Sequence, residues 1–83
     1  MKVHLRYFAS LRETLGQGSE TVETSAATLG ALRDELIAKG GAYVEALGRG
    51  RVVRAALNQT MSEESAALTE GAEIGFFPPV TGG

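Results

Sequence analysis

The stretch of sequence that decides the fold is Ala72-Glu73-Ile74-Gly75-Phe76-Phe77-Pro78-Pro79. Its alternation places Ile74 and Phe76 on one face of a strand and Phe77 on the other. The strand must end at Pro78, because proline has no N–H to donate to a sheet. The sequence therefore predicts a last strand over residues 72–77 whose inner face is apolar.

The chain also opens as a strand, in which Val3, Leu5 and Tyr7 alternate with polar neighbours. The segment between the first and last strands is long enough for a crossover, so we expect the two strands to lie side by side and parallel. Phe8 and Phe77 would then lie at one edge of the sheet, both on its outer face. Such a pair suggests a partner surface; the alternative is that loops or the segment 61–68 cover it.

The remaining elements follow from helical spacing and turn residues. Residues 9–15 predict a short helix ended by Gly16, residues 19–24 a weak second strand, and residues 42–47 a short helix that can bury Tyr43, Val44 and Leu47. The main helix begins at the cap Thr28, carries the stripe Leu29, Leu32, Leu36 and Ile37, and ends at Gly40-Gly41. Residues 52–57 predict a third strand, Asn58-Gln59 a turn, Thr60-Met61 a brief extended piece, and residues 68–71 the turn before the last strand.

This order of elements predicts an α+β fold, a mixed sheet with one main helix packed across one face, as in the β-grasp fold of ubiquitin. A chain of 83 residues is the size of one domain. We expect a single domain over residues 1–83, with residues 78–83 as an extended C-terminal tail. Pro78-Pro79 stiffens the start of this tail, and Gly82-Gly83 can enter a slot too narrow for side chains.

The composition excludes most other kinds of site. With no Cys and a single His, His4, the chain has neither a metal-ligand cluster nor a nucleophile–base pair, so we expect no metal and a surface role for His4. We expect Glu63 and Glu64 to be solvated surface charges. The arginines Arg6, Arg51 and Arg54 are also expected to be solvated, and the second interpretation is that they form an electrostatic docking patch. A net charge of −2 argues against nucleic-acid binding. Without an apolar span or a signal peptide, a cytoplasmic location with no membrane contact is expected.

The terminal carboxylate of Gly83 is therefore the best candidate for chemistry. A carboxylate acylates nothing unaided, so a partner enzyme must activate it, most naturally as an acyl-adenylate made from ATP. Attack by a sulfur donor would then give a thiocarboxylate, whereas attack by an amine would give an amide.

The chain resembles the small subunits of molybdopterin synthase, which are sulfur carriers of the ubiquitin-like β-grasp group. The resemblance covers the whole chain. Its most specific motif is residues 76–83, and weaker motifs occur in the right order at residues 7–13, 57–60 and 68–74. Glu70 and Glu73 stand where such turns often carry aspartate, which changes little.

The resemblance implies a cycle of partners, with no cofactor bound by the chain itself. An adenylating enzyme of the ubiquitin-activating type would use ATP to activate Gly83, and a sulfur donor system would convert it to a thiocarboxylate. The tail, Pro78, Pro79, Val80, Thr81 and Gly82, would insert into the large synthase subunit, giving a heterotetramer, and sulfur would pass to a pterin precursor. Phe8, Met61 and Phe77 would form the partner interface. The chain would be a carrier subunit rather than a catalyst.

Three alternatives stay open. A thiamine-pathway sulfur carrier uses the same tail chemistry, but such chains are usually shorter and lack the Phe-Phe-Pro-Pro approach. A ubiquitin-like modifier would form amide bonds to lysines of target proteins. A plain β-grasp interaction domain would have no tail chemistry.

Overall fold

The computed structural model describes residues 1–79 of the chain. In this part of the chain the elements are β1 (Lys2–Tyr7), α1 (Ala9–Leu15), β2 (Ser19–Glu23), α2 (Leu29–Ala38), α3 (Ala42–Leu47), β3 (Arg54–Leu57), β4 (Thr60–Ser62) and β5 (Glu73–Phe77). Most predicted elements are present, within one or two residues of their expected ends.

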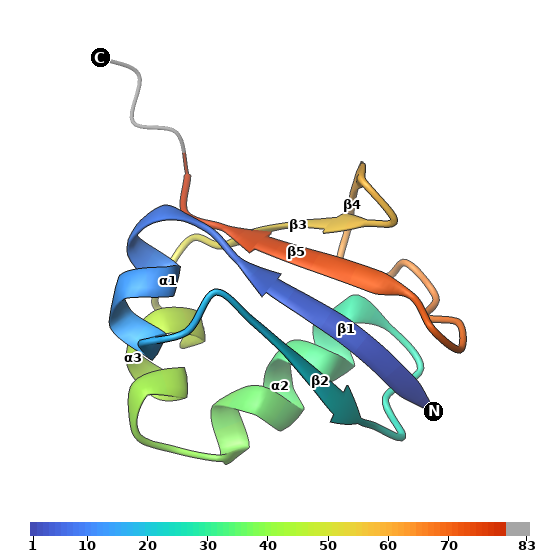
Figure 1. Ribbon diagram of the computed structural model, residues 1–83, viewed down its shortest axis with the longest axis horizontal. Coiled ribbons are helices and arrows are strands. Elements are labelled where there is room, and N and C mark those ends of the chain that lie inside the picture. The colour runs from blue at the N-terminus through green and yellow to red at the C-terminus, as the bar shows by residue number, and fades with distance from the viewer. Residues whose placement is uncertain (80–83) are drawn as a thin grey trace.

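The strands form one sheet in the order β2-β1-β5-β3-β4 (Figure 1). The first and last strands of the chain are parallel neighbours, with Leu5 opposite Ile74 and Tyr7 opposite Phe76. The pairs β1–β2, β3–β5 and β3–β4 are antiparallel. The predicted parallel pairing is thus confirmed, and it places β5 in the middle of the sheet.

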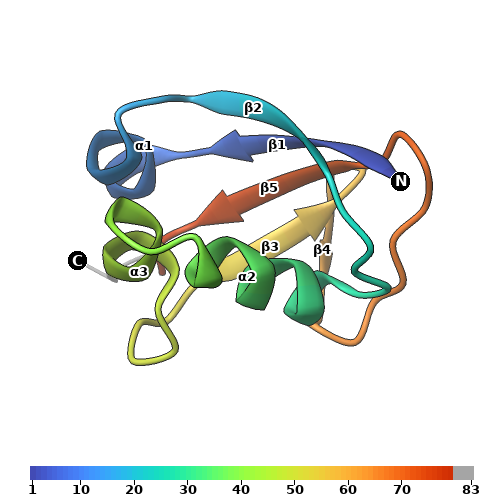
Figure 2. The same cartoon turned by 90° about the horizontal axis from the view of Figure 1, so that it is seen from below.

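Helix α2 lies across one face of this sheet, while α1 and α3 lie together at the end where β5 finishes (Figure 2). The burial of β1 alternates along its whole length, as its sequence predicts. A sheet with mixed strand directions and one main helix across one face is the β-grasp arrangement expected from the sequence. Within residues 1–79 no helix has the length and apolar character needed to cross a bilayer.

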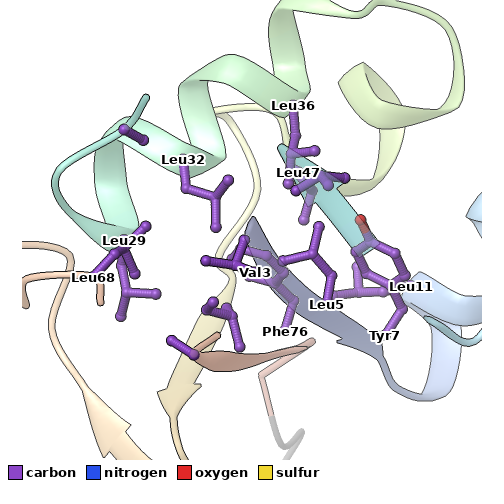
Figure 3. Close-up of a cluster of buried hydrophobic side chains, with 14 of the residues drawn as sticks. Val3, Leu5, Tyr7, Leu11, Leu29, Leu32, Leu36, Leu47, Leu68 and Phe76 are labelled. Atoms are coloured by element: carbon purple, nitrogen blue, oxygen red, sulfur yellow. The ribbon is translucent and has the colours of Figure 1, made fainter. Parts of the chain in front are cut away.

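The core forms between the inner face of the sheet and α2 (Figure 3). Tyr7 and Phe76, which pair across β1 and β5, stack with ring centroids 6.1 Å apart. Each is at most 2% exposed. Full burial of one such side chain contributes about 1.5–3 kcal/mol. The other fully buried large side chains are Val3, Leu5, Leu29, Leu32, Leu36, Leu47 and Ile74.

The predicted turns and caps have clear physical causes in the structure. The hydroxyl of Thr28 accepts a hydrogen bond from the backbone N–H of Ala31 and so caps α2. Asn58 and Gln59 both have positive φ angles, 49° and 70°, which suit the tight turn between β3 and β4. The side-chain carbonyl of Asn58 also accepts a hydrogen bond from Glu73 N, which ties this turn to β5.

Two local expectations were wrong. In α3, Ala46 and Leu47 are buried, whereas Val44 is 48% exposed, because this short helix turns Val44 away from the core. The third strand begins at Arg54 rather than Val52, which is 66% exposed. The residues before Arg54 form a loop whose backbone is bonded to a side chain of α2 instead of to the sheet.

That side chain is Arg33, which is 7% exposed and was missed by the sequence analysis. Its guanidinium donates to the carbonyls of Leu47, Gly48 and Arg51 and forms an ion pair with Glu64 at 2.8 Å. Glu64 is therefore the ion-pair partner of a buried arginine and not simply a solvated surface charge, which corrects the expectation from sequence. Its second oxygen accepts from Arg49, which also bonds Asp34 and the carbonyl of Gly30.

We predict that Arg33→Met lowers the free energy of unfolding by about 3 kcal/mol, because three loop carbonyls and one carboxylate lose a buried partner. The matched control is Arg49→Met, at a site where the side chain is 45% exposed. It should cost about 1 kcal/mol or less. Urea unfolding followed by circular dichroism measures both variants. Equal losses in the two would contradict a special role for the buried arginine.

The ion pairs of Glu64 also predict a pH dependence. Its hydrogen bonds from Arg49 first, and then from Arg33, lower the pKa of the Glu64 carboxyl. A carboxyl whose pKa is lower in the folded chain stabilises the fold above its ordinary pKa of about 4.3, and this contribution disappears as the pH falls. Glu64→Gln should thus be less stable than the unchanged chain at neutral pH, and the gap should close in acid. Thermal melts of both chains from neutral pH down to below the ordinary pKa of glutamate measure this gap in stability. A gap that does not change with pH would contradict the prediction.

Candidate functional site

The tail leaves the fold at the carboxyl end of β5, beside the carboxyl end of β1. Because these strands are parallel, Phe8, which follows β1, lies next to Phe77. The two rings stack at a centroid distance of 4.7 Å with planes 10° apart. Each ring shields the other, so both are half-buried rather than fully exposed. Strand phase, together with the expected parallel pairing of the two strands, predicts this arrangement.

Gly75 explains how the two rings come to lie so close to the backbone of β5. A Cβ atom at this position would lie 3.1 Å from Phe8 Cε2 and 3.3 Å from Phe77 Cζ. The missing side chain therefore leaves the space that the rings occupy. Arg6 lies 5.7 Å above the centre of the Phe8 ring, at a distance suited to a cation–π contact.

Met61 completes this region from β4. It is 56% exposed and is paired with Ala56 of β3, which in turn pairs with Gly75. The register thus puts Met61 on the outer face of the sheet together with the aromatic pair. We call Phe8, Met61 and Phe77 the outer apolar patch. The structure brings these three predicted interface residues to one side of the tail's base; their contact with a partner stays a prediction.

A groove of about 960 Å³ adjoins the patch at the start of the tail. The residues that line it come from α1, from α3 and the loop after it, from β3 and β4, and from the end of β5 with Pro78 and Pro79. Pro78 is half-buried and Pro79 is exposed. The other predicted tail residues, Val80, Thr81, Gly82 and Gly83, lie outside the described residues.

The structure also shows where the side chains that could bind a metal ion lie within residues 1–79. These residues contain no group of three His, Cys, Asp or Glu side chains that could hold a metal ion. His4 is on the exposed face of β1, where its Nδ1 lies 3.0 Å from the hydroxyl of Thr21. This fits the surface role expected for His4.

One polar cluster that the sequence did not reveal links β1, β2 and α3. The hydroxyls of Tyr7 and Tyr43 both donate to one oxygen of Glu20, at 2.7 and 2.6 Å. Burial, and then the hydrogen bond to Glu20, raise the pKa of Tyr7 far above its ordinary value, so this hydroxyl keeps its proton. The same causes raise the pKa of Tyr43. We interpret the cluster as a structural contact that holds α3 against the sheet.

Comparison with known proteins gives matches over nearly the whole chain. The model of the ThiS family matches residues 5–83. The molybdopterin synthase sulfur carrier subunit of Haemophilus influenzae is 40% identical over 81 residues, which cover 98% of this chain and 99% of that protein.

Solved structures share the fold over the same length. SAMP1 of Haloferax volcanii, the small archaeal modifier protein 1, superposes with a TM-score of 0.79 at 25% identity, and the match covers 100% of both chains. A chain from the complex of subunits 1 and 2 of the molybdopterin-converting factor of Helicobacter pylori has a TM-score of 0.70 at 30% identity, again over 100% of both chains.

We predict opposite outcomes for the two neighbouring aromatic residues of β5. Phe76→Asp should cost about 4 kcal/mol or more, because it places a charge in the core. Phe77→Asp should cost about 1.5 kcal/mol or less, the loss of one aromatic pair on the outer face. Chemical unfolding measures both, and similar losses would show that Phe77 serves the core.

Proposed function

We propose, for a chain that belongs to the ThiS family and within it to the molybdopterin synthase sulfur carrier subunits, that Gly83 carries sulfur as a C-terminal thiocarboxylate. The observation that carries the proposal is the Gly-Gly terminus, which follows a central strand by only a few residues. The rigid sheet presents the start of the tail, and the reacting group is the terminus itself.

The chemistry begins in a partner enzyme that uses ATP. The Gly83 carboxylate attacks the α-phosphorus of ATP and pyrophosphate leaves, which gives the acyl-adenylate. A sulfide-level nucleophile from a sulfur donor system then attacks the carbonyl carbon, AMP leaves, and a thiocarboxylate remains. The chain has no cysteine, so no thiol of its own can compete for the sulfur. We place this ATP-dependent cycle in the cytoplasm, with no cofactor resident on the carrier.

The acceptor partner is the large subunit of molybdopterin synthase. Likeness to a subunit from the Helicobacter pylori complex supports such a partner. We propose that the outer apolar patch docks on the large subunit and on the activating enzyme in turn, while Pro78, Pro79, Val80, Thr81 and Gly82 enter the partner's channel. The thiocarboxylate sulfur then bonds to a carbon of a pterin precursor, and water cleaves the acyl–sulfur bond and restores the Gly83 carboxylate. Each product takes two sulfurs from two carriers, in a heterotetramer.

A second function, protein modification, is favoured by the likeness to SAMP1 of Haloferax volcanii. The activated terminus would be the same, but a lysine amine would attack in place of sulfur. The thiamine-pathway carrier differs only after the thiocarboxylate is formed. Intact mass of the chain purified from its own cells separates these classes: a gain of sulfur in place of oxygen supports a carrier, whereas conjugates through lysine support a modifier.

We predict that removal of Gly83, or addition of one residue after it, abolishes sulfur transfer and leaves thermal unfolding nearly unchanged. Either change displaces the reacting carboxylate, but the core ends at Phe76 and β5 ends at Phe77. Synthase assays with the large subunit and melting curves measure the two effects. Full activity of the shortened chain would overturn the proposed function.

Gly82→Val tests the narrow channel separately, because it keeps the terminal carboxylate. We predict that this variant, chemically thiocarboxylated so that it bypasses activation, transfers sulfur at least tenfold more slowly than the matched thiocarboxylated chain. A normal transfer rate would show that only the activating enzyme requires the glycines.

A further inference from the structure

The groove beside the start of the tail has a volume of about 960 Å³ and extends from Pro78-Pro79 to α1, α3 and β4. Its floor and walls include Phe8, Leu11, Ala46, Val52 and Met61, and its rim at one side is Pro78-Pro79. Figure 1 shows that α1 and the end of β5, where the tail begins, lie at the same end of the fold. The last described residues, Pro78 and Pro79, therefore lie against an apolar groove of the chain itself.

Two apolar side chains of the groove are unusually accessible. Val52 is 66% exposed, and Met61 is 56% exposed. Val52 is held out by the loop that Arg33 fixes through the carbonyl of Arg51, so its position is set by hydrogen bonds and not by free motion of a loop end. A segment that covered both side chains would remove this apolar surface from water.

The groove also carries unbalanced positive charge. Arg51 and Arg54 line it together with one carboxylate, that of Glu45. Within residues 1–79 no carboxylate lies within 4.0 Å of either guanidinium; the ion pairs of that part of the chain use Arg6, Arg33, Arg49 and the N-terminus. Arginine suits a carboxylate partner, because its planar fork can donate two parallel hydrogen bonds.

We propose that the groove binds the chain's own residues 80–83, with Val80 against Val52 and Met61 and the carboxylate of Gly83 at Arg51 and Arg54. Three features of this segment fit the site: it is attached at the rim, its one large side chain is apolar, and it ends in a negative charge. Four extended residues reach roughly 13 Å past Pro79. Because the segment is tethered, its effective concentration at the groove is high without any second molecule.

This self-docked tail is a different state from the one that partners use. Phe8, Met61 and Phe77 belong both to the groove and to the outer apolar patch. A docked tail and a docked partner therefore exclude each other, and a partner must displace the tail before Gly83 can enter its channel. The inference concerns the free chain alone and stands or falls independently of sulfur transfer.

The test uses backbone amide chemical shifts of the full chain in solution. Deletion of residues 80–83 should shift the amides of Val52, Arg54 and Met61, which border the groove, more than those of β2 at the other edge of the sheet. The double variant Arg51→Gln/Arg54→Gln, and separately the chain with an amidated C-terminus, should each reproduce at least half of the change that the deletion causes at Val52 and Met61. Lys2→Gln, at the opposite end of β1, is the charge control and should reproduce none of it.

Three results would overturn the proposal. In the first, the deletion leaves the groove amides unchanged. In the second, the shifts depend on protein concentration, which would mean that the tail of another copy occupies the groove. In the third, the deletion acts but neither charge change does, so that the carboxylate–arginine contact is absent.

Discussion

The parallel pairing of β1 with β5 is the interaction on which the rest of this structure depends. It joins the two ends of the described chain in the centre of one sheet. On the inner face it brings Tyr7 against Phe76, and α2 closes over them. On the outer face it brings Phe8 against Phe77, next to the start of the tail. One pairing therefore builds both the core and the aromatic surface beside Pro78, where the tail begins.

The two faces of β5 have different physical tasks. The inner side chains, Ile74 and Phe76, are fully buried and supply hydrophobic stabilisation. Phe77, by contrast, is half-buried and stacks on Phe8. Gly75 between them carries no side chain, so the rings lie against the backbone. Because the two rings stack on each other, a partner that covered them would gain apolar burial with little side-chain ordering.

A network of charged side chains joins α2 to the loop before β3 and to the chain after β4. Arg33 leaves α2 to bond the backbone of the loop before β3, and Glu64 and Arg49 extend this network to the chain after β4. Both segments run outside the sheet, so their carbonyls are bonded by the Arg33 side chain and by backbone N–H groups instead of by a neighbouring strand. The loop so fixed carries Arg51 and Val52, so the buried arginine also shapes the groove beside the tail.

Patterns in the sequence predict the fold class, the phase of β1 and β5, the cap of the main helix and the Phe8–Phe77 pair, and the structure confirms each of them. These are local patterns, because alternation, helical spacing and glycine or proline positions act within a few residues. Four features became visible only in the folded chain: Arg33 is buried, Glu64 is its partner, Val44 faces outward, and Tyr7 and Tyr43 share Glu20. Each of these depends on which distant segments meet, and a charged or polar residue gives no periodic signal of the partner that will satisfy it after folding.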